Sequence, residues 1–234
     1  AMLETLNEAF VDAGKDPAVR VIILAAVGPV FSAGHDLKEM TAGRDAPDRG
    51  RAYFAKVMAM CSTMMQSIVN CPKPVIAEVN GVATAAGCQL VASCDLAVAT
   101  DASGFMTPGV NLGLFCSTPM VALSRNVSNK HAMEMLLTGE MTSAARAEEM
   151  GLVNRVVAEA DLAATTDHFA GLIASKSSLT VATGKRAFYV QAEMALSDAY
   201  EYASDVMVQN MLARDAEEGI GAFFEKRAPE WKDS

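Results

Sequence analysis

The sequence predicts an α/β domain with a layered core and a helical C-terminal extension. Short apolar runs alternate with segments of helical periodicity over the first two thirds of the chain, and the last third carries helical patterns alone. No linker, low-complexity segment or short-period repeat interrupts this order. We therefore predict one domain over residues 1–234, with a core at about 1–157 and a helical region at 158–234.

Each expected element depends on a local signal. Apolar residues three or four positions apart predict helices that bury one face, and short β-branched runs predict strands. Pro72 ends the long helix before it, and 107–119 has the composition of a loop. The expected helices are 1–14, 49–70, 83–93, 131–137, 143–150, 161–175, 180–194, 198–213 and 215–226. The expected strands are 19–27, which is apolar enough to be covered on both faces, 75–79, 95–100 and 152–157.

Composition and charge exclude several classes of protein. The chain has 19 Lys plus Arg against 28 Asp plus Glu, and this net charge of −9 argues against nucleic acid as a partner. The longest apolar run near the N-terminus, 21–27, is too short to cross a bilayer, so no membrane span is expected. The five cysteines show no C-x-x-C pairing, which is typical of buried free thiols, and the three histidines lack metal-ligand spacing.

Two segments place small residues between a strand and a helix. The first is 32–37 (SAGHDL), and the second is 80–89 (NGVATAAGCQ). Main-chain N–H groups at a helix start are unpaired and partly positive, and small side chains allow a ligand oxygen to approach them. Two such donors that converge would form an oxyanion hole. Spacing alone makes this a weak signal, because glycine after a strand more often marks a simple turn.

The same segments resemble the crotonase superfamily, the enoyl-CoA hydratase/isomerase family, over essentially the whole chain. VRVIILAAVGPVFSAGHDLKEM is similar to the family's first oxyanion segment, and PVIAEVNGVATAAGCQLVASCDLAVATD is similar to the second. TPGVNLGLFCSTP occupies the place of the third active-site loop. AMEMLLTGEMTSAARAEEMGLVNRVV resembles the later helix-helix-strand signature.

The resemblance implies a crotonase-like spiral of β-β-α units with a C-terminal helical trimerisation region. It implies a homotrimer or a dimer of trimers that binds an acyl-CoA thioester, with coenzyme A as part of the substrate, no permanently bound cofactor and no metal. The thioester oxygen would lie between the main-chain N–H groups of His35 and Ala86, which stabilise an enolate. By match to the family's motifs, the substrate-binding positions are Ala33, His35, Asp36, Leu37, Lys38, Ala85, Ala86, Pro108, Gly109, Asn111 and Leu112.

The chain departs from the family at both catalytic glutamates of the hydratases. Those positions hold Gln89 and Gly109, and Ser117 stands where some dienoyl isomerases have an aspartate. Hydration needs a base to activate water and an acid to protonate the α-carbon, and neither an amide nor a hydrogen atom supplies these. We therefore expect little ordinary hydratase activity.

Three replacement chemistries stay open. The His35 imidazole could act as an acid or base, although its family role is through the main chain. Cys116 and Ser117 could form a nucleophile pair, but no partner base is identifiable. Asn111 and Gln89 could position water or a polar acyl group, and this is the best suited of the three. Glu78, the nearby carboxylate, is expected on the opposite face of its strand.

Other features have both a functional and a plain structural interpretation; the two are equal for Lys38, and the structural one is favoured for the others. A basic series follows the first oxyanion segment and could hold the phosphates of coenzyme A, but charge runs are usually solvated helix faces; its members are Lys38, Arg44, Arg49, Arg51 and Lys56. The helical region carries Met194, Met207 and Met211, which could form a subunit contact or ordinary core. Because residues 1–10 resemble the middle of a helix, we expect that an N-terminal strand and a loop contacting coenzyme A are missing.

The sequence thus favours an acyl-CoA-binding enzyme of fatty-acid or acyl-CoA metabolism, a lyase or isomerase with an atypical active site. Enolate-stabilised steps with little acid–base work, such as decarboxylation of a β-carboxyl thioester, would suit it best. The alternatives are a non-catalytic acyl-CoA-binding or regulatory homologue and a scaffold subunit without a ligand. The Ala-rich composition favours a bacterial cytoplasm, and a mitochondrial matrix location is the alternative if a transit peptide precedes this sequence.

Overall fold

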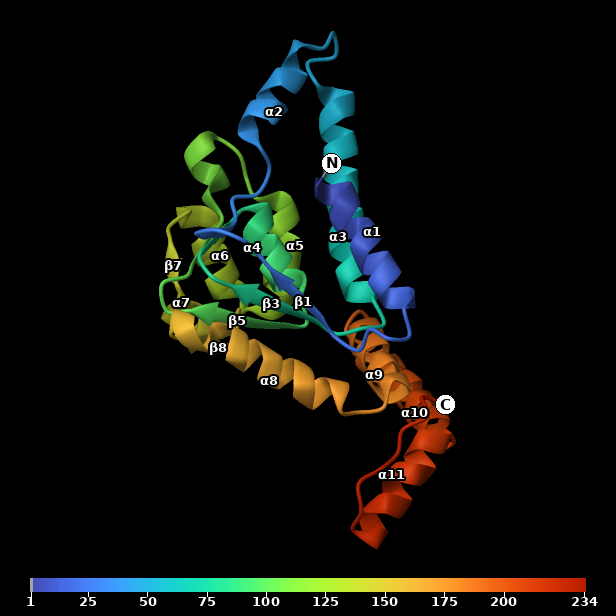
Figure 1. Ribbon diagram of the computed structural model, residues 1–234. Helices are drawn as coiled ribbons and strands as arrows, with labels where there is room; N and C mark the ends of the chain where they lie inside the picture. The colour runs from blue at the N-terminus through green and yellow to red at the C-terminus, as the bar shows by residue number, and fades with distance from the viewer. Residues whose placement is uncertain (1) are drawn as a thin grey trace.

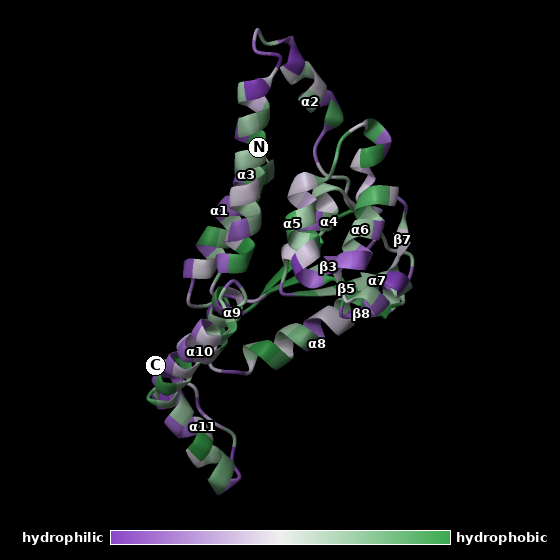
Figure 2. Cartoon of the chain, turned by 180° about the vertical axis from the view of Figure 1, so that it is seen from behind, coloured by the Kyte–Doolittle hydropathy of each residue, from purple (hydrophilic) through white to green (hydrophobic). Residues whose placement is uncertain are grey.

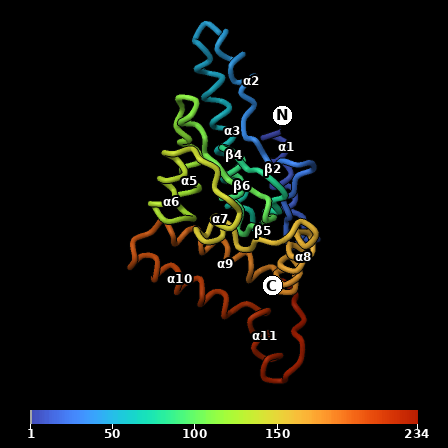
Figure 3. The backbone as a smooth tube through the Cα atoms, turned by 90° about the vertical axis from the view of Figure 1, so that its left-hand side faces the viewer, coloured from blue at the N-terminus to red at the C-terminus, as the bar shows by residue number. Residues whose placement is uncertain are grey.

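A computed structural model describes residues 2–234, in which the strands form two four-stranded sheets (Figures 1 and 3). The first sheet is parallel throughout and has the order β1 (Ile22–Ala25), β3 (Val75–Val79), β5 (Leu96–Thr100), β8 (Arg155–Val157). The second has the order β2 (Val30–Ser32), β4 (Val82–Thr84), β6 (Gly104–Met106), β7 (Thr142–Ser143), with only β7 antiparallel to its neighbour. Each turn of the chain thus adds one strand to each sheet, which confirms the predicted spiral of β-β-α units.

The helices surround these sheets and then extend away from them. α3 and α4 lie on one side of the first sheet and α8 on the other, whereas α10 and α11 project from the body as an arm (Figure 1). The helices are α1 (Met2–Lys15), α2 (Leu37–Ala42), α3 (Arg51–Asn70), α4 (Ala86–Ser93), α5 (Ser117–Asn126), α6 (Asn129–Thr138), α7 (Ala144–Met150), α8 (Leu162–Ala174), α9 (Ser178–Gln191), α10 (Leu196–Met211) and α11 (Arg214–Glu225). The predicted helical C-terminal region is present.

Side-chain alternation along β3 separates the core into two layers. Val75, Ala77 and Val79 are buried in the main core with α3 and α4, whereas Ile76 packs with Leu162 of α8 on the other face. Glu78 alternates with these core residues, so its side chain belongs to the α8 face. The alternation of its neighbours agrees with the expected placement of this carboxylate on the opposite face of the strand, which stays a prediction.

Three expectations about the elements are wrong. β1 is an edge strand with alternating exposure rather than one covered on both faces, and it is shorter than the predicted 19–27. The strands β2 and β4 were expected as loop and helix, because runs of three residues are too short to show a period. Met194, Met207 and Met211 are exposed in this chain, so they are not ordinary core.

The turns of the spiral approach one another closely enough to require glycine. A Cβ atom added at Gly81 would lie 2.2 Å from the carbonyl oxygen of Pro29, and this separation leaves no room for a side chain. Beside it, the Asn80 side chain donates to the carbonyl oxygens of Ala26 and Gly28, at 3.3 and 2.8 Å. The Asn80-Gly81 turn thus fastens the second unit of the spiral to the first.

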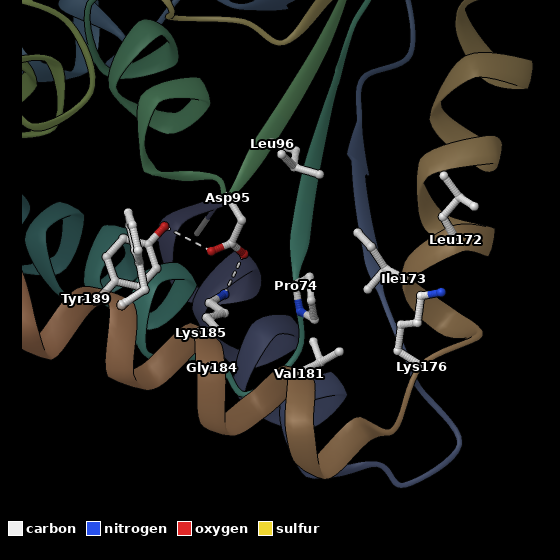
Figure 4. A pocket seen from close by; sticks show the side chains of 11 residues that line it. Pro74, Asp95, Leu96, Leu172, Ile173, Lys176, Val181, Gly184, Lys185 and Tyr189 are labelled. Carbon is white, nitrogen blue, oxygen red and sulfur yellow. Dashed lines mark hydrogen bonds and ion pairs between the residues drawn. The ribbon is translucent and has the colours of Figure 1, made fainter. Parts of the chain in front are cut away.

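A buried ion pair docks the helical region onto the core. Lys185 of α9 donates to the carbonyl oxygens of Ile68 and Lys73, at 2.9 and 3.0 Å, and to the carboxylate of Asp95, at 2.6 Å (Figure 4). Tyr189, one turn later, donates to the other Asp95 oxygen at 2.9 Å. The side chains of Lys185 and Asp95 are only 6% and 16% exposed, so the pair is shielded from water.

We predict that Lys185→Met lowers the free energy of unfolding by about 3–5 kcal/mol, because it leaves the Asp95 carboxylate buried without its cation. Chemical denaturation followed by circular dichroism measures this loss. Arg125→Met is the matched control, since it breaks an ion pair with Glu193 whose side chains are 55% and 63% exposed. Equal losses in the two variants would contradict the assignment of Lys185 as the docking residue.

Candidate functional site

The two glycine-containing segments lie against each other at the ends of β2 and β4. Ser32 pairs with Ala83 across these strands, and the Thr84 hydroxyl donates to the carbonyl oxygen of Ala33 at 3.0 Å. A Cβ atom added at Gly34 would lie 3.1 Å from the main-chain nitrogen of Ala86. The chain therefore brings the turn that contains His35 directly beside the start of α4, as expected from the motif.

The main chain turns sharply where α4 begins. Ala85 has φ 50° and ψ −115°, a conformation that L residues rarely adopt, and it is held there by a 2.8 Å hydrogen bond from its N–H to the carbonyl oxygen of Met106. Ala86 is the first residue of the helix, so its N–H has no acceptor within the helix. Gly87 is buried, and a Cβ atom there would lie 2.2 Å from the main-chain carbonyl oxygen of Ser32. The strained turn presents the Ala86 N–H beside the first segment.

His35 is half-buried in the first of these turns, directly after Gly34, which has φ 83°. Its Nε2 atom is closed off from solvent and has no hydrogen-bond partner among the described residues. Burial lowers the pKa of His35 below its ordinary 6.5, and this effect is partly opposed by the Glu39 carboxylate. The imidazole is therefore neutral at pH 7.

Gln89 lies one turn into α4 and is 4% exposed. Its N–H donates to the carbonyl oxygen of Ala85 at 3.0 Å, and its side-chain Oε1 lies 4.0 Å from the thiol of Cys61 on α3. The amide therefore lies at the contact between α3 and α4. At this position a glutamate would be enclosed by the same apolar core.

Gly109 is buried in a 3₁₀ helix at Pro108–Leu112, and neighbouring atoms fill the space around it. A Cβ atom there would lie 2.9 Å from Sγ of Cys116 and 3.1 Å from the carbonyl oxygen of Leu114. Burial raises the pKa of the Cys116 thiol, which argues against this residue as a nucleophile at neutral pH. The third loop is thus closed over the position where the hydratases carry a glutamate.

The remaining predicted site residues have structural partners or face solvent. The Asp36 carboxylate caps α2 by accepting from the N–H groups of Lys38 and Glu39, at 2.8 and 3.3 Å.

In the third loop, Asn111 donates to the carbonyl oxygen of Gly139 at 3.4 Å, so it connects this loop to the end of α6. The side chains of Leu37, Lys38 and Leu112 are exposed. Their predicted substrate contacts stay predictions.

Sequence reasoning missed two parts of this arrangement. The hydroxyl of Thr84 and the carbonyl of Met106 hold the turns at Ala33 and Ala85 in place, yet sequence reasoning gave neither residue a role. The parallel pairing of β4 with β6, which aligns Thr84 with Met106, places the third loop beside α4. A short strand of small residues gives no periodic signal, so only the structure reveals this pairing.

A cavity of about 490 Å³ lies elsewhere, between α8, α9 and the start of β5 (Figure 4). Its walls are apolar, with Leu172 and Phe188 exposed beside it, and the Lys185–Asp95–Tyr189 cluster closes one end. No residue of the predicted site contributes to it. Within residues 2–234, no cluster of three or more His, Cys, Asp or Glu side chains could hold a metal ion.

A two-sheet spiral with paired turns at the start of α4 defines the class of protein. The sequence model of the family described as enoyl-CoA hydratase/isomerase matches residues 1–234, and the chain belongs to this family. The crotonase-type fold and acyl-CoA-related family predicted from the motifs are thus confirmed.

Relatives from animals and bacteria cover almost the whole chain. The mouse protein named "Enoyl-CoA hydratase domain-containing protein 3, mitochondrial" is 53% identical over 99% of this chain and 75% of its own length. The crystal structure of a Mycobacterium smegmatis enoyl-CoA hydratase is 52% identical, has a TM-score of 0.94 and covers 99% of this chain and 88% of its own. The crystal structure of human enoyl Coenzyme A hydratase domain-containing protein 3 is 52% identical with a TM-score of 0.93, covering 98% and 89%.

These comparisons correct the expected location. The curated mouse, rat, human and Xenopus relatives, which are 50–53% identical to this chain, are named as mitochondrial proteins. The preference for a bacterial cytoplasm, which depended on the Ala-rich composition, is therefore wrong. No helix within residues 2–234 combines the length and the apolar character that a membrane crossing requires.

We predict that Ala85→Gly raises the free energy of unfolding by about 1 kcal/mol, because glycine adopts this conformation without the steric strain of a Cβ atom. Thermal or chemical denaturation measures the change. The same substitution at Ala55, on an exposed face of α3, is the control and lowers stability by about 1 kcal/mol through helix propensity. A loss of stability at both positions would contradict the strained geometry at the start of α4.

Proposed function

We propose that this protein is an acyl-CoA-binding enzyme of fatty-acid or acyl-CoA metabolism that stabilises a thioester enolate. The observation that carries the proposal is the contact between the turn at Gly34 and the start of α4, which places the main-chain N–H groups of His35 and Ala86 on neighbouring turns. Two such groups would donate hydrogen bonds to the thioester oxygen. Coenzyme A is then part of the substrate, and no other bound cofactor is invoked.

Main-chain donors suit this chemistry because negative charge moves onto the thioester oxygen as the enolate forms. Preformed dipoles need no reorganisation at that moment, and one donor typically contributes about 10²–10³ in rate. The close packing of Gly34 and Gly87 fixes both turns, so the donors cannot relax away from the oxygen. Enolate-forming steps of an isomerase or lyase are the reaction types that this site supports.

Efficient hydration of enoyl thioesters is disfavoured by the residues at the two glutamate positions. Gln89 cannot exchange a proton, and Gly109 has no side chain. The Cys116 thiol and the Leu114 carbonyl occupy the space that a side chain at position 109 would need. A protein from Escherichia coli named "Carnitinyl-CoA dehydratase" is 34% identical over 97% of this chain. The relatives are therefore named for more than one acyl-CoA substrate.

The helical arm supports the proposal of a homotrimer or a dimer of trimers. α10 and α11 carry large apolar side chains that no part of the described chain covers, and hydrophobic stretches alternate with polar ones along α11 (Figure 2). Leu212, Phe223 and Phe224 are 77%, 78% and 76% exposed. Apolar surface of this extent marks a protein–protein contact, and other copies of the chain would cover it.

We predict that Ala86→Pro lowers turnover of the preferred acyl-CoA by at least about 10²–10³, because proline deletes the N–H donor. It also disturbs the turn, since Ala85 at φ 50° and ψ −115° lies outside the extended region that a residue before proline adopts. Wild type and variant are compared on a panel of enoyl-, 3-enoyl- and β-carboxyacyl-CoA thioesters. Leu196→Pro, at the first position of α10, is the matched control and leaves turnover unchanged.

Three outcomes separate the rival functions. Turnover in wild type with unchanged turnover in a folded Ala86→Pro variant would refute the oxyanion hole. Tight binding without turnover of any panel member would support the non-catalytic alternative. Absence of acyl-CoA binding in calorimetry would support a scaffold subunit.

We also predict that wild type hydrates crotonyl-CoA more slowly than a hydratase with both glutamates, by about 10²–10⁴, the usual contribution of a general acid or base. Gln89→Glu with Gly109→Glu restores activity only when Cys116→Ala makes room in the third loop. Loss of enoyl absorbance measures the rate. A wild-type rate equal to that of an efficient hydratase would show that these positions were misinterpreted.

A further inference from the structure

The cavity of about 490 Å³ between α8 and α9 has no role in the proposed function. Leu172 and Phe188, which are 49% and 64% exposed, line it together with Ile173 and Val181. Cavities of about 300–1,000 Å³ with mostly apolar walls are typical of small-molecule sites, in which a few polar groups fix the orientation of the ligand. The polar groups around this cavity therefore decide which ligand it fits.

The polar cluster at one end of the cavity is already complete. Lys185 uses its three N–H groups on two main-chain carbonyl oxygens and on the Asp95 carboxylate, and Tyr189 donates to the second Asp95 oxygen (Figure 4). Asp95 also accepts the N–H of Val75 at 2.7 Å. Burial raises the pKa of Tyr189, so its phenol stays protonated at neutral pH. This end has no free donor for a ligand, and its charges cancel.

The opposite end of the cavity is positively charged. Figure 4 shows Lys176 at this end, on the far side of Val181 from Tyr189. A smaller pocket adjoins the cavity there, because Lys176 and Val181 belong to the walls of both, and this pocket is also lined by Arg20 and Lys73. Three cationic side chains thus meet where the apolar walls end.

Two of these three cations have no counter-charge. Arg20 forms an ion pair with Asp233 at 2.7 Å. Lys73 and Lys176 form no ion pair within residues 2–234. The chain as a whole has a net charge of −9, so two unpaired lysines beside an apolar cavity are a local exception. They complement a ligand that carries an anionic group on a hydrocarbon chain.

We propose that this cavity is a binding site for aliphatic carboxylates, separate from the proposed acyl-CoA site. The hydrocarbon chain lies between α8 and α9 against Leu172, Ile173 and Phe188, and the carboxylate accepts from Lys73 and Lys176. Burial of the chain supplies the affinity, because each methylene removed from water favours binding by up to about fourfold. The lysines select an anion over a neutral head group.

The test of the cavity uses decanoate and isothermal titration calorimetry on the native protein. Gly184→Phe should lower the affinity at least about tenfold, because the ring displaces two or more methylenes of the chain. Gly184 lines the cavity, and a Cβ atom there meets no other atom within 4 Å, so the ring has room to enter. Gly171→Phe is the matched control: Gly171 of α8 is equally open but does not line the cavity, and this variant should bind like wild type.

The test of the charge uses the two lysines. Lys73→Gln and Lys176→Gln should each lower the affinity for decanoate by about two- to fivefold, the contribution of a solvent-accessible charge pair. Neither should change the affinity for decanol, which has the same chain without the charge. Lys130→Gln is the control, because it removes the same charge from an exposed position of α6 that does not line either pocket.

Each outcome decides the proposal. Unchanged affinity in Gly184→Phe overturns it, as does decanol bound as tightly as decanoate. Displacement of decanoate by coenzyme A would place the ligand at the acyl-CoA site and also overturns it, while leaving the proposed function intact. Wild type that binds no decanoate overturns it too, and a smaller assembly of Gly184→Phe in sedimentation would then show that a second copy fills the cavity.

A second measurement applies if Gly184→Phe does not fold. Wild type is photo-crosslinked to decanoate that carries a diazirine on its chain, and mass spectrometry locates the label. The label should lie on α8 or α9, and a label confined to other elements overturns the proposal.

Discussion

The contact between the main chain after β2 and the start of α4 is the constraint on which the rest of the structure depends. At Gly87 the two segments approach so closely that a Cβ atom would lie 2.2 Å from the carbonyl oxygen of Ser32, and at Gly34 it would lie 3.1 Å from the main-chain nitrogen of Ala86. Such proximity is possible only where glycine removes the side chain. It follows from the spiral, because β2 and β4 are neighbours in the second sheet. The geometry of the candidate site therefore depends on the pairing of β2 with β4.

The opposite end of α4 is held equally firmly. Asp95 is the second residue after the end of α4, and it forms the buried ion pair with Lys185 of α9. The helix spans only eight residues, so its two ends are rigidly connected. The strained conformation of Ala85 can persist because both ends are fixed by tertiary contacts. The docking of the helical region and the strained turn at Ala85 are therefore connected through one short helix.

The long elements could be predicted from the sequence, whereas the short ones could not. The pattern of α3 and the β-branched run of β3 gave bounds within two residues, because each element carries enough apolar positions to show its period. β2, β4 and β6 have three residues each and gave no such signal. Glycine at the strand ends drew attention to the segments at 32–37 and 80–89, but that spacing is a weak signal, and their interpretation as an oxyanion hole came from the resemblance to the family. The closure of the third loop around Gly109 could not be found from the sequence, since it depends on Cys116, seven positions away, folding back onto the glycine.

The proposed hole of main-chain donors would also resolve a difficulty posed by the charge of the protein. A chain with a net charge of −9 disfavours an anionic intermediate, and two glutamates in the site would add to that repulsion. Main-chain N–H groups supply partial positive charge that does not titrate, and the site lacks both glutamates.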